Sequence, residues 1–218
     1  MAIDKSRSKP WVKTLALILA VALIFGLSAL AFLPELFQSS ASTTGAAASG
    51  TQASTTSTAT IDATYKTAVD STAKQLNAKP NDYTLLVAQA TNYQNWASKL
   101  ADASGKGPGG EDMAYWPLAI ALYKQALAIK PGDSEVTTNL GLCYLYSGDT
   151  ATAITTIEAV TKADPTFSQP FYFLGRAYQS SGQSAKALSA YQTYVKLDPS
   201  GDFASDANVQ IAQLKTAK

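Results

Sequence analysis

Hydrophobic side chains recur every three or four residues along most of the chain after residue 60, which is the spacing of one face of an α-helix. Over residues 61–78, for example, Tyr65, Val69 and Leu76 fall on one stripe. Similar stripes, separated by short segments rich in Gly, Pro, Asn and Asp, continue to a final helix within residues 202–218. The pattern predicts an all-α region made of many short helices.

A fixed period organises these helices. Pro131, Pro165 and Pro199 are separated by 165 − 131 = 34 and 199 − 165 = 34 residues. Each interval carries a Leu-Gly pair, a tyrosine, a glycine and an alanine in the same register: Leu140-Gly141 and Leu174-Gly175, Tyr144 and Tyr178, Gly148 and Gly182, Ala153 and Ala187. Self-similarity at this period predicts stacked helical hairpins, because one such unit cannot bury its own apolar face.

The repeated positions have physical roles in a helical hairpin. Gly141 has no side chain, so a second helix can approach its backbone, and we expect the small Ala153 to nest there. Gly148 supplies a stop for the first helix, and the Asp149 that follows supplies an N-cap for the second. Pro165 ends the pair, because proline inside a helix loses a hydrogen bond and clashes with the preceding turn.

These units resemble tetratricopeptide repeats, whose pattern over 34 residues is a large apolar residue, Leu, Gly and Tyr, then Ala, an aromatic residue, Ala and Pro. The sequence departs from that pattern at Thr137, where the family often has Trp, and at Tyr194, where Ala is usual. The resemblance implies an α-solenoid of about three hairpins with a leading helix and a C-terminal capping helix. The expected repeats cover about residues 81–131, 132–165 and 166–199, within a domain of residues 61–218 that ends in a cap over 202–218.

The first repeat contains an insertion. Pro80 and Pro131 are 51 residues apart, and 51 − 34 leaves 17 residues, placed at about 98–116. We expect part of this insertion to extend the first helix and residues 104–110 to form a loop. Pro117 either begins the next helix or bends it. The aromatic residues of this region, Trp96, Tyr115 and Trp116, are expected to form a local core; the alternative is an exposed hydrophobic site.

The N-terminus has the pattern of a membrane anchor. Residues 1–13 carry four basic residues against one acid, and twenty uncharged residues follow from Thr14 to Leu33. Twenty helical residues span about 30 Å, the thickness of a bilayer core. We expect a transmembrane anchor over residues 14–37, and the basic segment places the N-terminus in the cytoplasm and the repeat domain outside.

A cleaved signal peptide is the alternative, since Ala29-Leu30-Ala31 resembles a cleavage site. Both interpretations export the repeats. Residues 38–60 consist almost wholly of Ser, Thr, Ala and Gly and predict a disordered linker.

Composition excludes several classes of chemistry. The net charge is +1, which gives no general attraction to nucleic acid. The sequence has no histidine and only one cysteine, Cys143, which is expected to be a small buried thiol. Lys106 lies in a glycine-rich loop that lacks the P-loop pattern, and the adjacent Glu111 and Asp112 suit the start of a helix. We therefore predict no enzyme, no cofactor and no metal site.

The resemblance implies a concave groove, lined by the first helix of each pair, that holds a peptide or protein partner. Some family members grip a partner's C-terminal carboxylate with a set of Lys, Asn and Arg residues, but here only Asn139 matches that set, with Val87 among its replacements. Tyr146, Tyr172 and Arg176 are residue types that dominate interface energies. The predicted groove residues are Thr91, Gln94, Thr138, Asn139, Leu142, Tyr146, Gln169, Tyr172, Phe173, Arg176 and Gln179.

The sequence thus favours a membrane-anchored interaction module: an adaptor, assembly factor or chaperone-like protein. Its layout is similar to that of bacterial envelope proteins, including repeat-bearing factors of cytochrome c assembly. The alternative is a structural envelope protein that self-associates into homo-oligomers.

Overall fold

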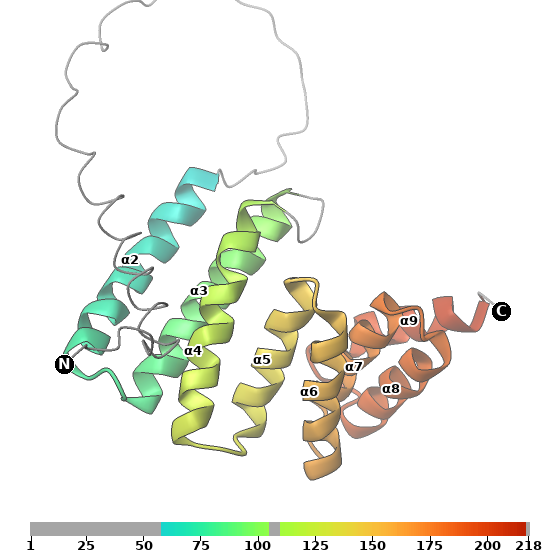
Figure 1. The fold of residues 1–218 in the computed structure, drawn as a ribbon. Helices are drawn as coiled ribbons and strands as arrows, with labels where there is room; N and C mark the ends of the chain where they lie inside the picture. The colour runs from blue at the N-terminus through green and yellow to red at the C-terminus, as the bar shows by residue number, and fades with distance from the viewer. Residues whose placement is uncertain (1–57, 105–109, 217–218) are drawn as a thin grey trace, which may run out of the picture. The chain divides into compact units, whose positions relative to one another are not determined.

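The computed structural model describes residues 58–104 and 110–216. Every regular element in that part of the chain is helical, and the elements follow one another along a row (Figure 1). They are α2 (Thr58–Ala78), α3 (Tyr83–Ser104), the 3₁₀ helix η1 (Glu111–Ala114), α4 (Trp116–Ile129), α5 (Ser134–Tyr146), α6 (Thr150–Ala163), α7 (Gln169–Ser180), α8 (Ser184–Leu197) and α9 (Ala204–Thr216). The all-α prediction is confirmed for the described residues.

The helices form a solenoid of hairpins. Each α-helix packs against the one before and the one after it in sequence, and α5 also contacts α7 across the intervening helix. The pairs α3–α4, α5–α6 and α7–α8 form three helical hairpins, with α2 before them and α9 after them in the chain. Buried side chains fill the spaces between neighbouring helices along the row.

The hairpin turns use the residues that the sequence supplies for them. After α5, Gly148 adopts φ 91°, a left-handed conformation that glycine tolerates best. The Asp149 N–H then donates to the Tyr144 carbonyl over 2.9 Å, which closes the helix end. The Asp149 carboxylate caps α6 by accepting from the Thr152 N–H over 3.1 Å, as predicted.

The two glycines of the Leu-Gly pairs mark close helix contacts, although with a different partner from the one expected. A Cβ built on Gly141 would collide with the Ile157 side chain, whereas the Ala153 carbonyl oxygen would lie 3.6 Å away. In the next repeat a Cβ on Gly175 would come within 2.7 Å of the Tyr191 ring. The large residue of the second helix, rather than the small alanine, therefore occupies the space above each glycine.

The insertion lengthens α3 and adds η1. The helix α3 runs on to Ser104, and Pro117 lies in the first turn of α4, where its missing N–H costs no hydrogen bond. Trp116 is fully buried and Trp96 is only 7% exposed. Trp96 and Tyr115 pack in one small cluster, and Trp116 lies in the larger cluster of the first two repeats. The alternative of an exposed site is wrong for both tryptophans.

The helical region begins slightly earlier in the chain than predicted. The helix α2 begins at Thr58, so residues 58–60 belong to the helix and not to the predicted linker. The basic segment, the anchor over 14–37 and the rest of the linker lie outside the described residues. Among the helices of the described part, none combines the length and apolar character that crossing a bilayer requires.

Candidate partner-binding groove

The predicted groove residues fall into buried and accessible groups. Thr138 is fully buried, and its hydroxyl donates to the Ser134 carbonyl over 2.7 Å. Leu142, Tyr172 and Phe173 belong to the core cluster that joins the last two repeats to α9. Side chains of these four predicted residues therefore hold the solenoid together, and only the Tyr172 hydroxyl also faces a surface hollow, described below.

Thr91 and Gln94 are half-buried and bound to a tyrosine from the next helix. The Tyr123 hydroxyl donates to Gln94 Oε1 over 2.7 Å and lies 3.0 Å from Thr91 Oγ1. The Cys143 thiol lies 3.6 Å from the same Gln94 oxygen. Cys143 is buried as expected, and burial raises the pKa of its thiol, which keeps it protonated and unreactive.

The other predicted residues keep part of their surface accessible. Asn139 and Gln169 are half-buried, and Gln179 is exposed. Tyr146 and Arg176 lie together: the guanidinium carbon is 5.1 Å from the centroid of the tyrosine ring, within range of a cation–π interaction. Trp116 stacks beside the same ring, with centroids 5.1 Å apart. This contact series joins the first, second and third repeats.

Burial and charge act in opposite directions on Tyr146. Burial raises the pKa of its hydroxyl, and the nearby positive charge of Arg176 opposes that rise. The ring is therefore a neutral platform at physiological pH. The platform holds the Arg176 side chain against the repeat stack.

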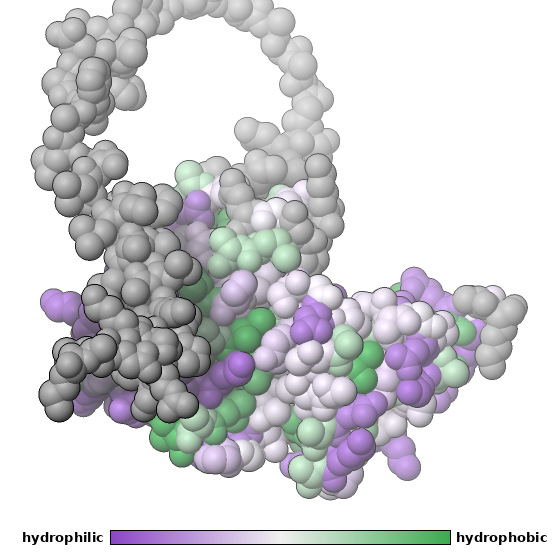
Figure 2. Space-filling view, viewed as in Figure 1, coloured by the Kyte–Doolittle hydropathy of each residue, from purple (hydrophilic) through white to green (hydrophobic). Residues whose placement is uncertain are grey.

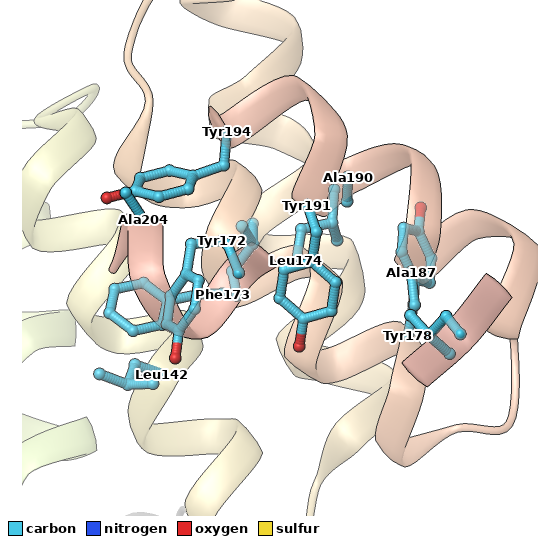
Figure 3. Close-up of a cluster of buried hydrophobic side chains, with 13 residues drawn as sticks. Leu142, Tyr172, Phe173, Leu174, Tyr178, Ala187, Ala190, Tyr191, Tyr194 and Ala204 are labelled. Carbon is cyan, nitrogen blue, oxygen red and sulfur yellow. The ribbon is translucent and has the colours of Figure 1, made fainter. Parts of the chain in front are cut away.

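A hollow of about 330 Å³ opens beside Arg176 between α7, α8 and α9. We call it the α7–α9 hollow. In the view of Figure 3, the phenol oxygens of Tyr172 and Tyr191 point to the same side of the core cluster, and both residues line the hollow. Its lining consists of Tyr172, Arg176, Gln179, Ser180, Tyr191, Asp206 and Gln210.

A chain of hydrogen bonds connects most of these groups. The Tyr191 hydroxyl donates to Gln179 Oε1 over 3.0 Å, and the Gln179 amide donates to Gln210 Oε1 over 3.0 Å. The Gln210 amide donates to Asp206 Oδ1 over 3.4 Å, and the Tyr172 hydroxyl donates to Asp206 Oδ2 over 2.7 Å. Burial is the main reason that the pKa values of Tyr172 and Tyr191 are raised, so both remain neutral donors.

Sequence reasoning missed the contribution of α9 to this hollow. The sequence pattern predicts only a capping helix over residues 202–218, which contains Asp206 and Gln210. The 34-residue period could have found them, because 206 − 172 = 34 and 210 − 176 = 34 place them in register with Tyr172 and Arg176. The helix α9 thus takes the place that the first helix of a fourth repeat would occupy.

A second aromatic group lies at the other end of the row. Trp96 stacks on Tyr115 with ring centroids 4.2 Å apart, and Tyr65 lies 6.4 Å from Trp96. The Trp96 indole N–H donates to Asp62 over 2.8 Å. This cluster binds α2 and η1 to α3, so its role is structural. Within the described ranges, no three His, Cys, Asp or Glu side chains gather closely enough to hold a metal ion.

Comparison with known proteins matches two family models, both described as tetratricopeptide repeats, to residues 116–170 and 168–200. No curated protein matches the sequence. The chain is similar to the crystal structure of MamA, with a TM-score of 0.56 and 20% identity over 72% of this chain and 82% of that one. A MamA RS-1 double mutant gives a TM-score of 0.51 and 19% identity over 71% and 87% of the two chains. At these identities the likeness concerns the fold.

Proposed function

We propose that this chain, which belongs to the tetratricopeptide repeat family through residues 116–200, is a protein–protein interaction module. Its partner would be a peptide or protein segment that lies along the face formed by α3, α5, α7 and α9. Adaptors, assembly factors and chaperone-like proteins would all use such a face to bind their partners.

One observation carries the proposal: Tyr146, Arg176 and the α7–α9 hollow lie side by side and keep accessible polar and aromatic groups. A tyrosine with an adjacent arginine has the composition of an interface hot spot. The surrounding helices are fixed by packed cores, so the face is ordered before a partner arrives, which lowers the entropic cost of binding.

The proposal is tested by crosslinking the tagged full-length protein in intact cells and identifying its partners by mass spectrometry. The groove variant carries Arg176→Ala and Gln179→Ala, two residues with accessible side chains. A matched variant carries Lys186→Ala and Gln192→Ala on α8, where both side chains are exposed. Circular dichroism checks that both variants fold.

We expect the groove variant to lose a specific partner that the α8 variant retains. Equal recovery of every partner by both variants would contradict binding through this face. Tyr172→Ala is unsuitable for this purpose, because the ring is buried and its removal would disturb the core.

We also propose that residues 14–37 anchor the module in a cell membrane with the repeats on the outer side, in a cell envelope. The basis is the uncharged run of the sequence and the basic residues before it. Protease added to intact spheroplasts should digest the repeat domain, and alkaline extraction should leave the full-length chain in the membrane fraction. Release of the chain by alkaline extraction would contradict the anchor. Protection of the repeat domain from the protease would contradict its orientation.

Self-association is the second candidate. It is less favoured because the helices at both ends of the row present mainly polar outer residues; Val209 on α9, 50% exposed, is the one large apolar exception among the described residues of these two helices. Sedimentation of the full-length protein in detergent over a range of concentrations would show a concentration-dependent mass if copies stack end to end.

A further inference from the structure

We infer that the α7–α9 hollow binds a carboxylate that has an N–H donor close to it, as one residue of a peptide presents: Arg176 takes the carboxylate and Asp206 accepts from the N–H. This inference rests on the proposed function and names the chemistry of the partner at one place in the groove.

Arg176 forms no ion pair within the part of the chain that the structure describes. The four ion pairs of the described ranges are Lys66–Asp70, Lys99–Asp102, Lys130–Asp133 and Lys162–Glu158, and all of them involve lysine. Arg176 is the one arginine in that part of the chain. It is half-buried and lies over the Tyr146 ring. Its planar group presents five donors suited to a bidentate contact with a carboxylate.

Apart from Ser180, the other polar groups of the hollow are hydrogen-bonded to one another. Gln179 and Gln210 each donate and accept within the hydrogen-bonded chain, which ends at Asp206. Each Asp206 oxygen receives one hydrogen bond and, as a carboxylate oxygen, can accept another. The Arg176 guanidinium hydrogen-bonds to Tyr146, which engages part of its set of five donors and leaves the rest for an anion. Asp206 is the group that can accept.

The opposite charges of Arg176 and Asp206 limit which chemical groups the ligand can carry. A ligand with only anionic groups would be repelled by Asp206, and a ligand with only cationic groups would be repelled by Arg176. An acidic peptide residue suits both groups, because its carboxylate can bind Arg176 while a neutral backbone N–H, a few covalent bonds away, donates to Asp206 and offsets the repulsion. The volume of about 330 Å³ is at the lower end for ligand pockets and suits one residue better than a folded element.

The hollow is also separate from the carboxylate-binding positions considered in the sequence. At those positions the chain carries Val87, Thr91, Gln169 and Phe173, none of which is charged. Thr91 is bound to Tyr123, and Phe173 lies in the core. The inferred site uses Arg176 one turn further along α7, together with residues of α8 and α9.

The experiment uses the arginine content of the chain. Full-length protein in detergent micelles, labelled with ¹⁵N only in arginine, gives two Nε–H signals, from Arg7 and Arg176. The variant Arg176→Lys assigns them. Three probes are titrated: acetyl-Ala-Ala-Glu-Ala-Ala-amide, the same peptide with Gln in place of Glu, and acetyl-Ala-Ala-Ala with a free C-terminal carboxylate.

We expect the Arg176 signal to shift in a saturable way with at least one of the two acidic probes and not with the Gln peptide. The internal acid and the free C-terminus are separate arms, so the stronger response identifies the source of the carboxylate. An equal response to the Gln peptide, no response to either acid, or an identical shift of Arg7 would overturn the inference, because Arg7 lies in a basic segment that attracts anions without a built site.

A matched pair of variants, prepared separately with ¹⁵N-labelled glutamine, gives a second readout from the side-chain amides of Gln179 and Gln210. Arg176→Gln should abolish their response to the acidic probe. Lys186→Gln removes a cation that lies over Tyr178 at 5.2 Å, outside the lining of the hollow, and should leave the response unchanged. Equal loss in both variants would show a general charge effect and overturn the inference.

The two hypotheses fail in different ways. If no acidic probe affects Arg176 but partner capture still depends on the groove variant, the carboxylate site is wrong and the interaction module stands. If capture is unaffected by the groove variant, partner binding through this face is wrong whatever the probes do.

Discussion

At the scale of single residues, Gly175 shows how a missing side chain creates part of the groove. Its bare backbone lets the Tyr191 ring lie against α7, and the Tyr191 hydroxyl then reaches Gln179 in the α7–α9 hollow. A methyl group at this position would collide with the ring at 2.7 Å. A residue of the core thus helps to set the hydrogen bonds of the candidate binding surface.

We predict that Gly175→Ala destabilises the fold by about 1–3 kcal/mol, since overpacking of a tight core contact outweighs the better helix propensity of alanine. Chemical denaturation measures the free energy of unfolding. Ser189→Ala, at an exposed position of α8, serves as the control and should change it by less than about 0.5 kcal/mol. Unfolding free energies that match the wild type in both variants would show that the contact relaxes freely.

Asp133 is a second residue at which local chemistry has a wider effect. Its carboxylate caps α5 through the Val136 N–H, accepts from the Tyr83 hydroxyl of α3 over 2.7 Å and pairs with Lys130. The hydrogen bonds from Lys130 and Tyr83 lower its pKa from 3.8 to about 2. One side chain therefore connects the first repeat to the second.

The sign of the pH dependence follows from that lowered pKa. The unfolded chain binds the proton more readily, so ionised Asp133 stabilises the folded state above about pH 4, and the contribution is lost as the pH falls to about 2. We predict that Asp133→Asn, which can still cap the helix, lowers the free energy of unfolding at neutral pH by about 1 kcal/mol. Parallel urea titrations should show the difference between variant and wild type shrinking towards pH 2, and a difference independent of pH would contradict this account.

At the scale of secondary-structure elements, side-chain hydrogen bonds join α2 to α3. The Asn92 amide donates to Thr72 over 3.2 Å, and the Trp96 indole donates to Asp62. Gln89 is 3% exposed, and its Oε1 atom has no hydrogen-bond partner among the described residues. A buried acceptor without a partner carries an uncompensated desolvation cost.

We predict that Gln89→Leu, which replaces the unpartnered amide with an apolar side chain of similar size, raises the free energy of unfolding by about 1 kcal/mol. Gln94→Leu is the matched control on the same helix, because Gln94 Oε1 accepts from Tyr123, and we expect that variant to lose about 1–3 kcal/mol. Thermal denaturation of both variants checks the pair. Destabilisation by Gln89→Leu would indicate that the amide is needed where it lies.

The elements themselves could largely be predicted, and the groove only in part. Helix pairs, turns and the register of the repeats follow from a period that residues such as Gly148 and Pro165 mark locally. Helical periodicity shows which residues share a stripe, but the curvature of the stack decides whether a given position lies in the core or in the groove. For that reason Phe173, which the pattern assigns to the groove, lies in the core instead, and the Tyr172 ring lies in the core while its hydroxyl faces the hollow.

At the scale of the whole described stack, the helices behave as a row in which each contacts mainly its sequence neighbours. Stability in such a row is set by each unit and its interfaces, so damage at one end should weaken the near repeats first. The cap interface is rich in aromatic contacts: Phe203 stacks on Tyr172 with centroids 4.3 Å apart, and its backbone N–H donates to the Tyr194 hydroxyl over 3.0 Å.

We predict that Phe203→Ala costs about 3 kcal/mol locally and that the loss is unevenly distributed. Hydrogen exchange followed by mass spectrometry should show faster exchange in α7, α8 and α9, with little change in α3 and α4. Val209→Ala, at an exposed position of the same region, is the control and should leave exchange unchanged throughout. Uniformly faster exchange across α3 to α9 would instead mean that the stack unfolds as one cooperative unit. If the change is confined to α7, α8 and α9, Phe203→Ala should also disturb the α7–α9 hollow before it disturbs the rest of the groove.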